Sequence, residues 1–134
     1  MSGNFKLEVV TPERIVVDEE AQMAIAPGVF GEFGVLVGHT PFLSSLKLGS
    51  LQYKDAGGQE RFVFINSGFA EVLPNKVTVL AESAERRKDI DVKRAEAALE
   101  RAQKRIAEAK EDLDAVRAEA AMARALQRLK IIRN

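Results

Sequence analysis

The side chains that could carry out covalent or acid–base chemistry are few in this 134-residue sequence. There is no cysteine and one histidine, His39, which excludes disulfides, thiolate ligands, cysteine nucleophiles and metal sites built from several histidines. No pair of acidic residues converges on a glycine-framed segment, so acid–base catalysis has no candidate pair. The sequence therefore disfavours a free-standing enzyme and directs attention to binding.

Residues 28–43 have a glycine spacing that superficially resembles a phosphate-binding loop. The glycines stand at positions 28, 31, 34 and 38, but no Gly-Lys-Ser/Thr sequence and no long helical pattern follows. Glycines in β domains are more often conformational, because they permit positive φ and close approach of strands. We interpret this segment as a turn-rich crossover between strands.

The chain has two parts of different composition, which meet at residues 90–95. The elements of these two parts must position any functional side chains. All nine glycines, all four prolines and all seven phenylalanines precede this stretch, whereas residues 85–134 contain twelve alanines and neither Gly nor Pro. Residues 1–84 carry six Lys/Arg against ten Asp/Glu, and residues 85–134 carry fourteen against ten. Interleaved acids and a lack of aromatic residues make the second part a poor nucleic-acid binder. We predict one domain over residues 1–84 and another over residues 85–134.

Residues 5–79 alternate with period two in short runs, which is typical of an antiparallel all-β unit. Turns are expected at residues 54–58 and at Pro74-Asn75, the latter inside a hairpin over residues 69–80. Strands every eight to twelve residues predict a β-sandwich or a flattened barrel. Two sets of apolar side chains are each expected to share one face: Phe5, Leu7 and Val9, and Ala21, Met23 and Ile25.

Beyond residue 82 the apolar period becomes helical and predicts two antiparallel helices of four or five turns each. Asp89 or Asp91 would cap the first, and Asp112 or Asp114 the second. The apolar seam along each helix is mostly alanine, so it buries little area and stabilises the helix pairing only weakly. The two seams consist of Ala95, Leu99, Ala102, Ile106, Ala109 and Leu113, and of Ala115, Ala118, Met122, Ala125, Leu129 and Ile132.

The sequence lacks the features of a membrane or exported protein. Residues 1–10 show no charged, apolar or transit-type leader pattern, and no apolar run approaches the length of a membrane span. We therefore expect a soluble chain with no direct membrane insertion, whose association with a membrane depends on a partner.

Three motifs in order make the chain resemble the epsilon subunit of the bacterial F-type ATP synthase, over almost its whole length. They are residues 31–41 (GEFGVLVGHTP), 74–82 (PNKVTVLAE) and 90–95 (IDVKRA). A β-sandwich followed by an alanine-rich helical hairpin matches as well. The sequence departs from the family at Val37, where Pro usually precedes Gly-His. The resemblance implies a non-catalytic regulatory subunit of a proton-translocating synthase.

The resemblance also implies a place in the central rotor. The sandwich would bind the gamma subunit and sit on the ring of c subunits, touching it through Gly31, Glu32 and His39. This would couple gamma to the c-ring during proton-driven ATP synthesis. A carboxylate on a glycine-bounded loop suits a basic partner loop. Without the family, Glu32 is an ordinary exposed acid and His39 a hydrogen-bonded structural histidine.

A nucleotide site is a second implication of the resemblance. Some bacterial epsilon subunits bind ATP at Ile/Leu-Asp-x-x-Arg-Ala, and residues 90–95 match every fixed position. The four implied arginines are suitably spaced for a triphosphate. Arg94 and Arg101 form an i,i+7 pair on one helix, and Arg124 and Arg128 form an i,i+4 pair on the other. The alternative is that they are solvated arginines paired with nearby acids. The implied set is Glu85, Ile90, Asp91, Arg94, Ala95, Arg101, Arg124 and Arg128.

The mobile C-terminal helices are further implied to inhibit ATP hydrolysis when extended, by reaching acidic segments of the alpha and beta subunits. The resemblance implies that no cofactor is required and that ATP can act as a regulatory ligand, and it leaves open whether Mg²⁺ accompanies the ATP. The implied location is the cytoplasmic face of the bacterial plasma membrane, or alternatively the chloroplast thylakoid. The inhibitory basic face would consist of Arg117, Arg124, Arg128, Lys130 and Arg133.

A competing interpretation is a generic β-sandwich binding module with a coiled-coil oligomerisation tail. An intramolecular helical hairpin predicts a monomer for the isolated chain, whereas an intermolecular coiled coil predicts a dimer. Sedimentation therefore separates the two interpretations.

Overall fold

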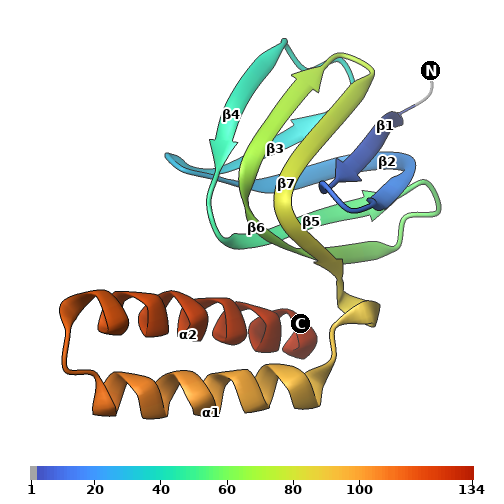
Figure 1. The fold of residues 1–134 in the computed structure, drawn as a ribbon. Coiled ribbons are helices and arrows are strands. Elements are labelled where there is room, and N and C mark those ends of the chain that lie inside the picture. Colours follow the sequence, from blue (N-terminus) through green and yellow to red (C-terminus); the bar gives the residue numbers. More distant parts are fainter. Residues whose placement is uncertain (1–2) are drawn as a thin grey trace. The chain divides into compact units, whose positions relative to one another are not determined.

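The computed structural model describes residues 3–134, and the chain divides into two compact units after Arg87. Residues 1 and 2, with which the expected first domain begins, lie outside the described residues. The boundary expected after Ala84 falls inside a strand, which keeps its pairing through Arg86. The elements are β1 (Phe5–Val10), β2 (Ile15–Gly28), β3 (Gly31–Leu36), β4 (Phe42–Leu46), β5 (Gly49–Asp55), β6 (Glu60–Leu73), β7 (Lys76–Arg86), a 3-10 turn η1 (Arg87–Asp89), α1 (Val92–Glu108) and α2 (Asp112–Arg133) (Figure 1).

Two 14-residue strands, β2 and β6, organise the first unit. The first half of β2 pairs with β1, and the second half pairs with β3 on one side and β5 on the other. Likewise β6 pairs first with β5 and then with β4, with β7 on its other side. Because β1 joins β2 to β7 and β5 joins β2 to β6, the seven strands close as a flattened β-sandwich. The expected fold class is confirmed.

One strand pair departs from the antiparallel expectation. β1 runs parallel to β7, with Leu7 opposite Val77 and Val9 opposite Val79. Alternation with period two is common to parallel and antiparallel strands, so the sequence pattern does not distinguish them. With β2 on its other side, β1 is held between two neighbours, and Leu7 and Val9 are fully buried in the core.

A bulge in β2 changes which of its side chains reach the core. The register between β2 and β5 slips by one residue between Ala21 and Met23. Beyond the slip, the buried side chains are Ala24, Ala26 and Pro27. The expectation that Met23 and Ile25 share a face with Ala21 is therefore wrong, and both are only partly buried.

Both predicted turns are present. β5 and β6 are connected across residues 56–59, within and just after the expected turn, and the hairpin over residues 69–80 has Pro74 and Asn75 at its tip. Gly68 precedes that hairpin, where β6 begins to pair with β4. It has a φ of +133°, and a Cβ there would lie 2.0 Å from the Leu80 carbonyl oxygen, so only glycine fits.

The second unit is an antiparallel pair formed by α1 and α2 (Figure 1). Asp91 caps α1 as expected, because its side chain accepts a hydrogen bond from the Arg94 amide at 3.0 Å. The cap expected for α2 is wrong, since Glu111 holds that position without a side-chain bond. Asp112 and Asp114 lie instead in the first turn of α2, where negative charge complements the helix dipole.

The buried contact between the helices is made largely by alanines. Ala95 and Ala102 of α1, and Ala118 and Ala125 of α2, are buried, as the predicted seams require. Leu113 was expected to extend the first seam but is 57% exposed, because it lies in the first turn of α2 rather than on α1. With 22 residues, α2 has about six turns and is longer than expected.

Candidate functional site

Glu32 lies near the start of β3, next to a tight β2–β3 hairpin. Gly31 has a φ of +126°, and a Cβ on Gly28 would lie 2.7 Å from the Gly31 carbonyl oxygen, so the hairpin depends on both glycines. The Glu32 side chain is exposed, while its backbone pairs opposite Pro27. A defined hairpin thus presents this carboxylate to solvent, where it is accessible to a partner.

His39 follows a second glycine turn. Gly38 has a φ of +83°, and the His39 amide donates to the Leu36 carbonyl at 3.2 Å. The His39 Nδ1 lies 2.6 Å from the Thr40 carbonyl oxygen, which only accepts, so Nδ1 donates the proton of this hydrogen bond and Nε2 takes no part in it. The ring also lies 6.2 Å from the Phe42 ring, centroid to centroid. His39 therefore has a structural partner and one nitrogen still available for a contact.

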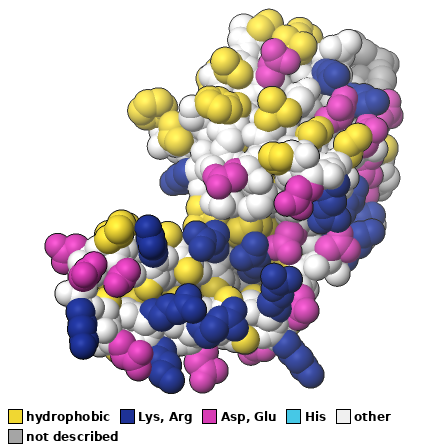
Figure 2. Space-filling model, in the orientation of Figure 1, with side chains coloured by type: hydrophobic (Ala, Val, Ile, Leu, Met, Phe, Trp, Pro, Cys, Tyr) yellow, Lys and Arg dark blue, Asp and Glu magenta, His cyan; other side chains and the backbone are white. Residues whose placement is uncertain are grey.

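Large apolar side chains are exposed on the outside of the sandwich (Figure 2). Leu43 of β4, Phe69 of β6 and Leu80 of β7 are 70%, 54% and 56% exposed. Phe69 and Leu80 stand opposite each other, and the pairing of β4 with β6 puts Leu43 on the same outer face. Phe30, at the tip of the β2–β3 hairpin, is fully exposed. Apolar groups gathered on one face are typical of a surface that binds another protein.

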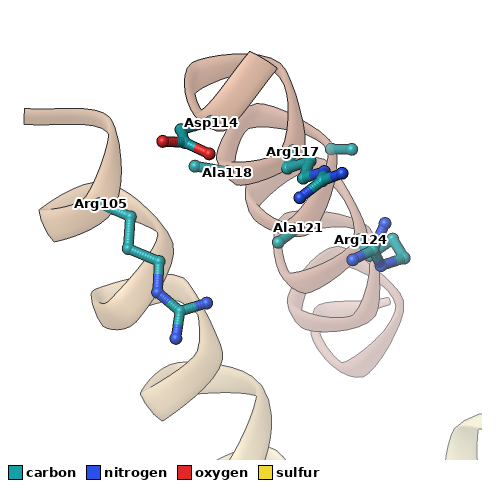
Figure 3. Close-up of a pocket in the computed structure, with 7 residues that line it drawn as sticks. Arg105, Asp114, Arg117, Ala118, Ala121 and Arg124 are labelled. Atoms are coloured by element: carbon teal, nitrogen blue, oxygen red, sulfur yellow. The ribbon is translucent and has the colours of Figure 1, made fainter. Parts of the chain in front are cut away.

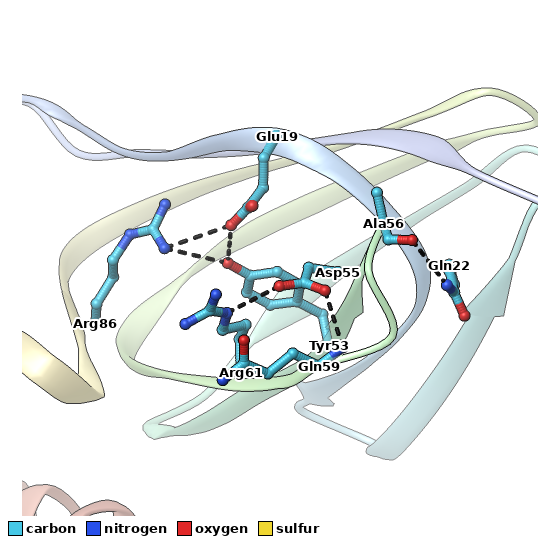
Figure 4. Close-up of polar contacts among 8 residues, drawn as sticks. All are labelled: Glu19, Gln22, Tyr53, Asp55, Ala56, Gln59, Arg61 and Arg86. Carbon is cyan, nitrogen blue, oxygen red and sulfur yellow. Dashed lines mark hydrogen bonds and ion pairs between the residues drawn. The ribbon is translucent and has the colours of Figure 1, made fainter.

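A polar network that sequence reasoning missed joins β2, β5 and β7 (Figure 4). The Tyr53 hydroxyl donates to Glu19 Oε2 at 2.5 Å, and Arg86 Nη1 lies 3.4 Å from the same carboxylate oxygen. Arg86 Nε also donates to the Val16 carbonyl at 2.9 Å. The sequence did offer one signal for this network: Tyr53 stands on a predicted buried strand, and a buried tyrosine hydroxyl needs a hydrogen-bond partner. The network fixes the end of β7, directly before the second unit begins.

Two side chains of this region have shifted pKa values. Burial, helped by the hydrogen bond to Glu19, raises the pKa of Tyr53 well above its usual value, so the phenol is neutral at physiological pH. The Gln59 amide, which donates to Asp55 at 2.9 Å, lowers the pKa of that carboxyl, and Arg61 at 3.0 Å adds to the effect. Both groups stabilise the sandwich and neither is poised for proton transfer.

The residues implied for ATP are divided between the two units. Glu85 lies in β7 of the sandwich, and the other seven belong to the helical unit. Ile90 and Ala95 are buried, and Asp91 is engaged as the helix cap. The side chains of Arg94 and Arg101 are exposed on α1, whereas Arg124 and Arg128 of α2 are partly exposed.

A groove of about 510 Å³ lies between α1 and α2 (Figure 3). Three arginines line it: Arg105 of α1, and Arg117 and Arg124 of α2. Asp114 is the acidic residue of the lining, and alanines complete it. Of the arginines implied for ATP, only Arg124 lines this groove. Sequence reasoning did not single out Arg105, because it is not among the residues that the resemblance implied for the nucleotide site or the inhibitory face.

The five cations expected to form one inhibitory face lie on two sides of α2. With about 100° of rotation per residue, Arg117, Arg124 and Arg128 fall within about 40° of one another. Lys130 and Arg133 are rotated from Arg117 by roughly 220° and 160°, respectively. An acidic partner therefore meets either the three arginines or the other two cations, and must wrap around the helix to meet all five.

Residues 3–134 lack the features of a clustered metal site and of a membrane-spanning helix. The side chains in this part of the chain contain no group of three or more His, Cys, Asp or Glu that is arranged to hold a metal ion. Neither of its two α-helices combines the length and the apolar character that a membrane span requires.

Comparison with known proteins gives a family match for each unit. Residues 4–87 match "ATP synthase, Delta/Epsilon chain, beta-sandwich domain", and residues 88–133 match "ATP synthase, Delta/Epsilon chain, long alpha-helix domain". The chain is 70% identical over 106 residues to the ATP synthase epsilon chain of Desulfatibacillum aliphaticivorans, covering 79% of this chain and 75% of that one. It is 63% identical over 106 residues to that of Desulfosudis oleivorans, covering 79% and 80%.

A solved structure shows the same fold. The Euglena gracilis mitochondrial ATP synthase (OSCP/F1/c-ring) contains a chain that matches with a TM-score of 0.83 and 22% identity, over 100% of this chain and 84% of that one. Both units and their order thus define a delta/epsilon chain of the ATP synthases. More narrowly, the chain belongs to the epsilon subunits of the bacterial F-type ATP synthases.

Proposed function

We propose that this chain is a non-catalytic rotor subunit, which couples gamma to the c-ring during proton-driven ATP synthesis. Family membership supports this, as do the similar structures, which are of an OSCP/F1/c-ring assembly from Euglena gracilis and of a central stalk with its c-ring from Tetrahymena thermophila. The observation that carries the proposal is the exterior of the sandwich. It offers an apolar face with Leu43, Phe69 and Leu80 for one partner, and Glu32 and His39 on glycine turns for another.

Replacing Glu32 tests the coupling role. In the assembled synthase, Glu32→Ala should reduce ATP-driven proton pumping relative to ATP hydrolysis, because an exposed acid facing a partner contributes across the interface. The melting temperature of the isolated subunit should hardly change, since Glu32 is exposed. Glu60→Ala, which removes another exposed acid of the sandwich, is the matched control. Lower stability with normal coupling would identify Glu32 as a structural residue.

The helical unit is proposed to regulate the enzyme. In the folded hairpin it binds ATP, with no other cofactor required. In an extended form, its basic residues contact the alpha and beta subunits and inhibit ATP hydrolysis. The exposed arginines on both helices support this, because guanidinium groups pair with phosphate or carboxylate through two hydrogen bonds. Since ATP is proposed to bind the folded form better, it would shift the population away from the inhibitory one.

Calorimetric titration of the isolated subunit with ATP tests the nucleotide role. Arg94→Ala and Arg101→Ala should each weaken binding by roughly ten- to a hundredfold if the side chain bonds a phosphate in a desolvated site. Lys104→Ala is the control, because about 200° of helical rotation separates Lys104 from the buried Ala102. Absence of binding at millimolar ATP would remove the sensor role and leave the rotor role standing.

We further propose that the isolated chain is a monomer and that it acts at the cytoplasmic face of the bacterial plasma membrane, held there by the complex. The antiparallel pairing of α1 and α2 within one chain supports the monomer, because the alanine seam is already covered. Sedimentation of the isolated protein at several concentrations should show one species of monomer mass. A dimer would favour the coiled-coil interpretation instead.

A further inference from the structure

The last part of β7 has a strand neighbour on one side. β6 pairs with β7 as far as Arg86, which stands opposite Val63, whereas β1 pairs with β7 only as far as Leu80. Among the strands of residues 3–134, β6 alone therefore pairs with residues 81–86. A strand end with one neighbour opens more easily than one that is held on both sides, unless another contact fixes it.

The Arg86 side chain supplies that contact by bridging the open side of β7 to β2. Its Nε donates to the Val16 carbonyl oxygen at 2.9 Å, so a side chain takes the place of a strand-to-strand hydrogen bond. Its Nη1 lies 3.4 Å from both Glu19 Oε2 and the Tyr53 hydroxyl (Figure 4). The fixed fork of the guanidinium reaches all three acceptors at once, which a lysine ammonium does not. Because Arg86 and Glu19 are partly buried, salt screens their ion pair less than an exposed one.

The next residue, Arg87, is held by β6. Its guanidinium carbon lies 5.1 Å from the centroid of the Phe62 ring, which is a cation–π distance. Two successive arginines thus attach the end of β7 to different strands of the sandwich. All of these contacts lie within the first unit, which ends at Arg87. We call Arg86, Arg87 and the groups that they contact the β7 clamp.

Beyond the β7 clamp, the connection to α1 is short. Lys88 and Asp89 are exposed and complete η1, and Asp91 already caps α1. A 3-10 turn has poorer hydrogen-bond geometry than an α-helix and is a common connector. Residues 88–90 are therefore the whole tether between the clamp and the capped helix.

We propose that the β7 clamp keeps this tether at three residues and so confines the reorientation of the helical unit to residues 88–90. The inference rests on the proposed function, in which the helices have a folded and an extended form. If the clamp opens, residues 85–87 join the tether and double its length. The effective concentration of a tethered group falls roughly as the −3/2 power of tether length, which is about threefold for a doubling. A closed clamp thereby favours the inhibitory contact of the extended helices.

Hydrogen exchange and ¹⁵N relaxation of the full-length chain locate the end of the ordered sandwich. In the parent, the backbone should stay ordered through Arg87 and become more mobile at residues 88–89. Arg86→Gln shortens the side chain and removes its charge, so the boundary should move back toward Ala84. Exchange at residues 84–86 should then rise roughly fivefold, as expected for the loss of one hydrogen bond. Unchanged amide signals from β1 to β5 verify that the sandwich is folded.

Two further variants make the test selective. Tyr53→Phe removes one acceptor and leaves the Val16 bond, so it should move the boundary less than Arg86→Gln does. Lys88→Gln removes the neighbouring exposed cation outside the clamp and should leave the boundary where it is. The proposal is overturned if residues 84–86 of the parent exchange as fast as residues 88–89, or if Arg86→Gln has no more effect than Lys88→Gln.

The assembled synthase tests the consequence for inhibition. At low ATP, where the extended form is favoured, Arg86→Gln should raise the initial rate of ATP hydrolysis by up to about threefold, and Lys88→Gln should not. A moved boundary with unchanged hydrolysis would overturn the link between tether length and inhibition. If the helices of the parent do not inhibit at all, the proposed regulatory function fails, and the exchange boundary alone then decides whether the clamp exists.

Discussion

Substitutions of Asp91 best distinguish a structural role from a ligand-binding role, because the structure already shows that Asp91 caps α1. Its carboxylate accepts a hydrogen bond from the Arg94 amide at 3.0 Å and caps α1. Replacing a capping Asp by Ala costs about 1 kcal/mol, and the lost charge near the helix N-terminus adds about 0.3 to 1 kcal/mol. Asp91→Asn keeps the cap and loses only the charge. We therefore expect Asp91→Ala to cost about 1 to 2 kcal/mol and Asp91→Asn less than 1 kcal/mol.

The assay combines hydrogen exchange at the first turn of α1 with an ATP titration of the same samples. If Asp91 acts only as a cap, each variant should lose ATP affinity in proportion to its loss of exchange protection. If Asp91 instead contacts the nucleotide directly, Asp91→Asn should reduce the affinity for ATP by more than the loss of exchange protection in α1 explains. Unchanged exchange of the Arg94 amide in Asp91→Ala would refute the capping argument itself.

Two further predictions concern the sandwich. A fragment of residues 1–87 should fold alone, whereas one ending at Ala84 should melt at a lower temperature by circular dichroism, because it lacks the Arg86 bonds to Val16 and Glu19. The raised pKa of Tyr53 means that the folded state holds the phenolic proton more tightly than the unfolded state does, so stability present below about pH 10 should fall as the pH rises further. In urea unfolding, Tyr53→Phe should cost about 1 kcal/mol at neutral pH and lose this alkaline dependence; an unchanged dependence would assign it to another group.

Features with a short-range cause were predictable from the sequence. The change of period near residues 90–95, the Pro74-Asn75 hairpin and the Asp91 cap each depend on neighbouring residues, and the structure has all three. Alternation also identified Leu7 and Val9 as core residues, because a side chain's face follows from its position in the strand.

What the sequence did not reveal depends on residues far apart in the chain. The slip at Ala21 comes from the pairing of β2 with β5, so no local pattern showed that Met23 leaves the core. The parallel pairing of β1 with β7 joins the two ends of the sandwich. The bond between Tyr53 and Glu19 spans 34 residues. Each of these three features depends on the closed strand topology of the sandwich, which local sequence patterns do not specify.

Arg105 was missed for a different reason. The arginines chosen from the sequence were those that the resemblance implied for the nucleotide site and the inhibitory face, and Arg105 is not among them. Its place in the groove depends on the antiparallel pairing of α1 with α2, so it follows only once both helices are located.

The seam between α1 and α2 is rich in alanine, so the helical unit has little buried apolar area to hold it closed. The four buried alanine methyl groups contribute only about 3 kcal/mol at about 0.8 kcal/mol each, and Ile131 is the one large side chain of α2 that is fully buried. The sandwich core, by contrast, is built from many large side chains such as Phe5, Leu7 and Tyr53. A ligand that binds only the folded hairpin adds about 2.7 kcal/mol when its concentration is a hundred times its Kd. If ATP binds only the folded hairpin, as proposed, its occupancy adds a contribution close to that of the alanine contacts and can shift the balance between paired and separated helices. Larger apolar residues in the seam would hold the hairpin closed at any ligand concentration and would remove that control.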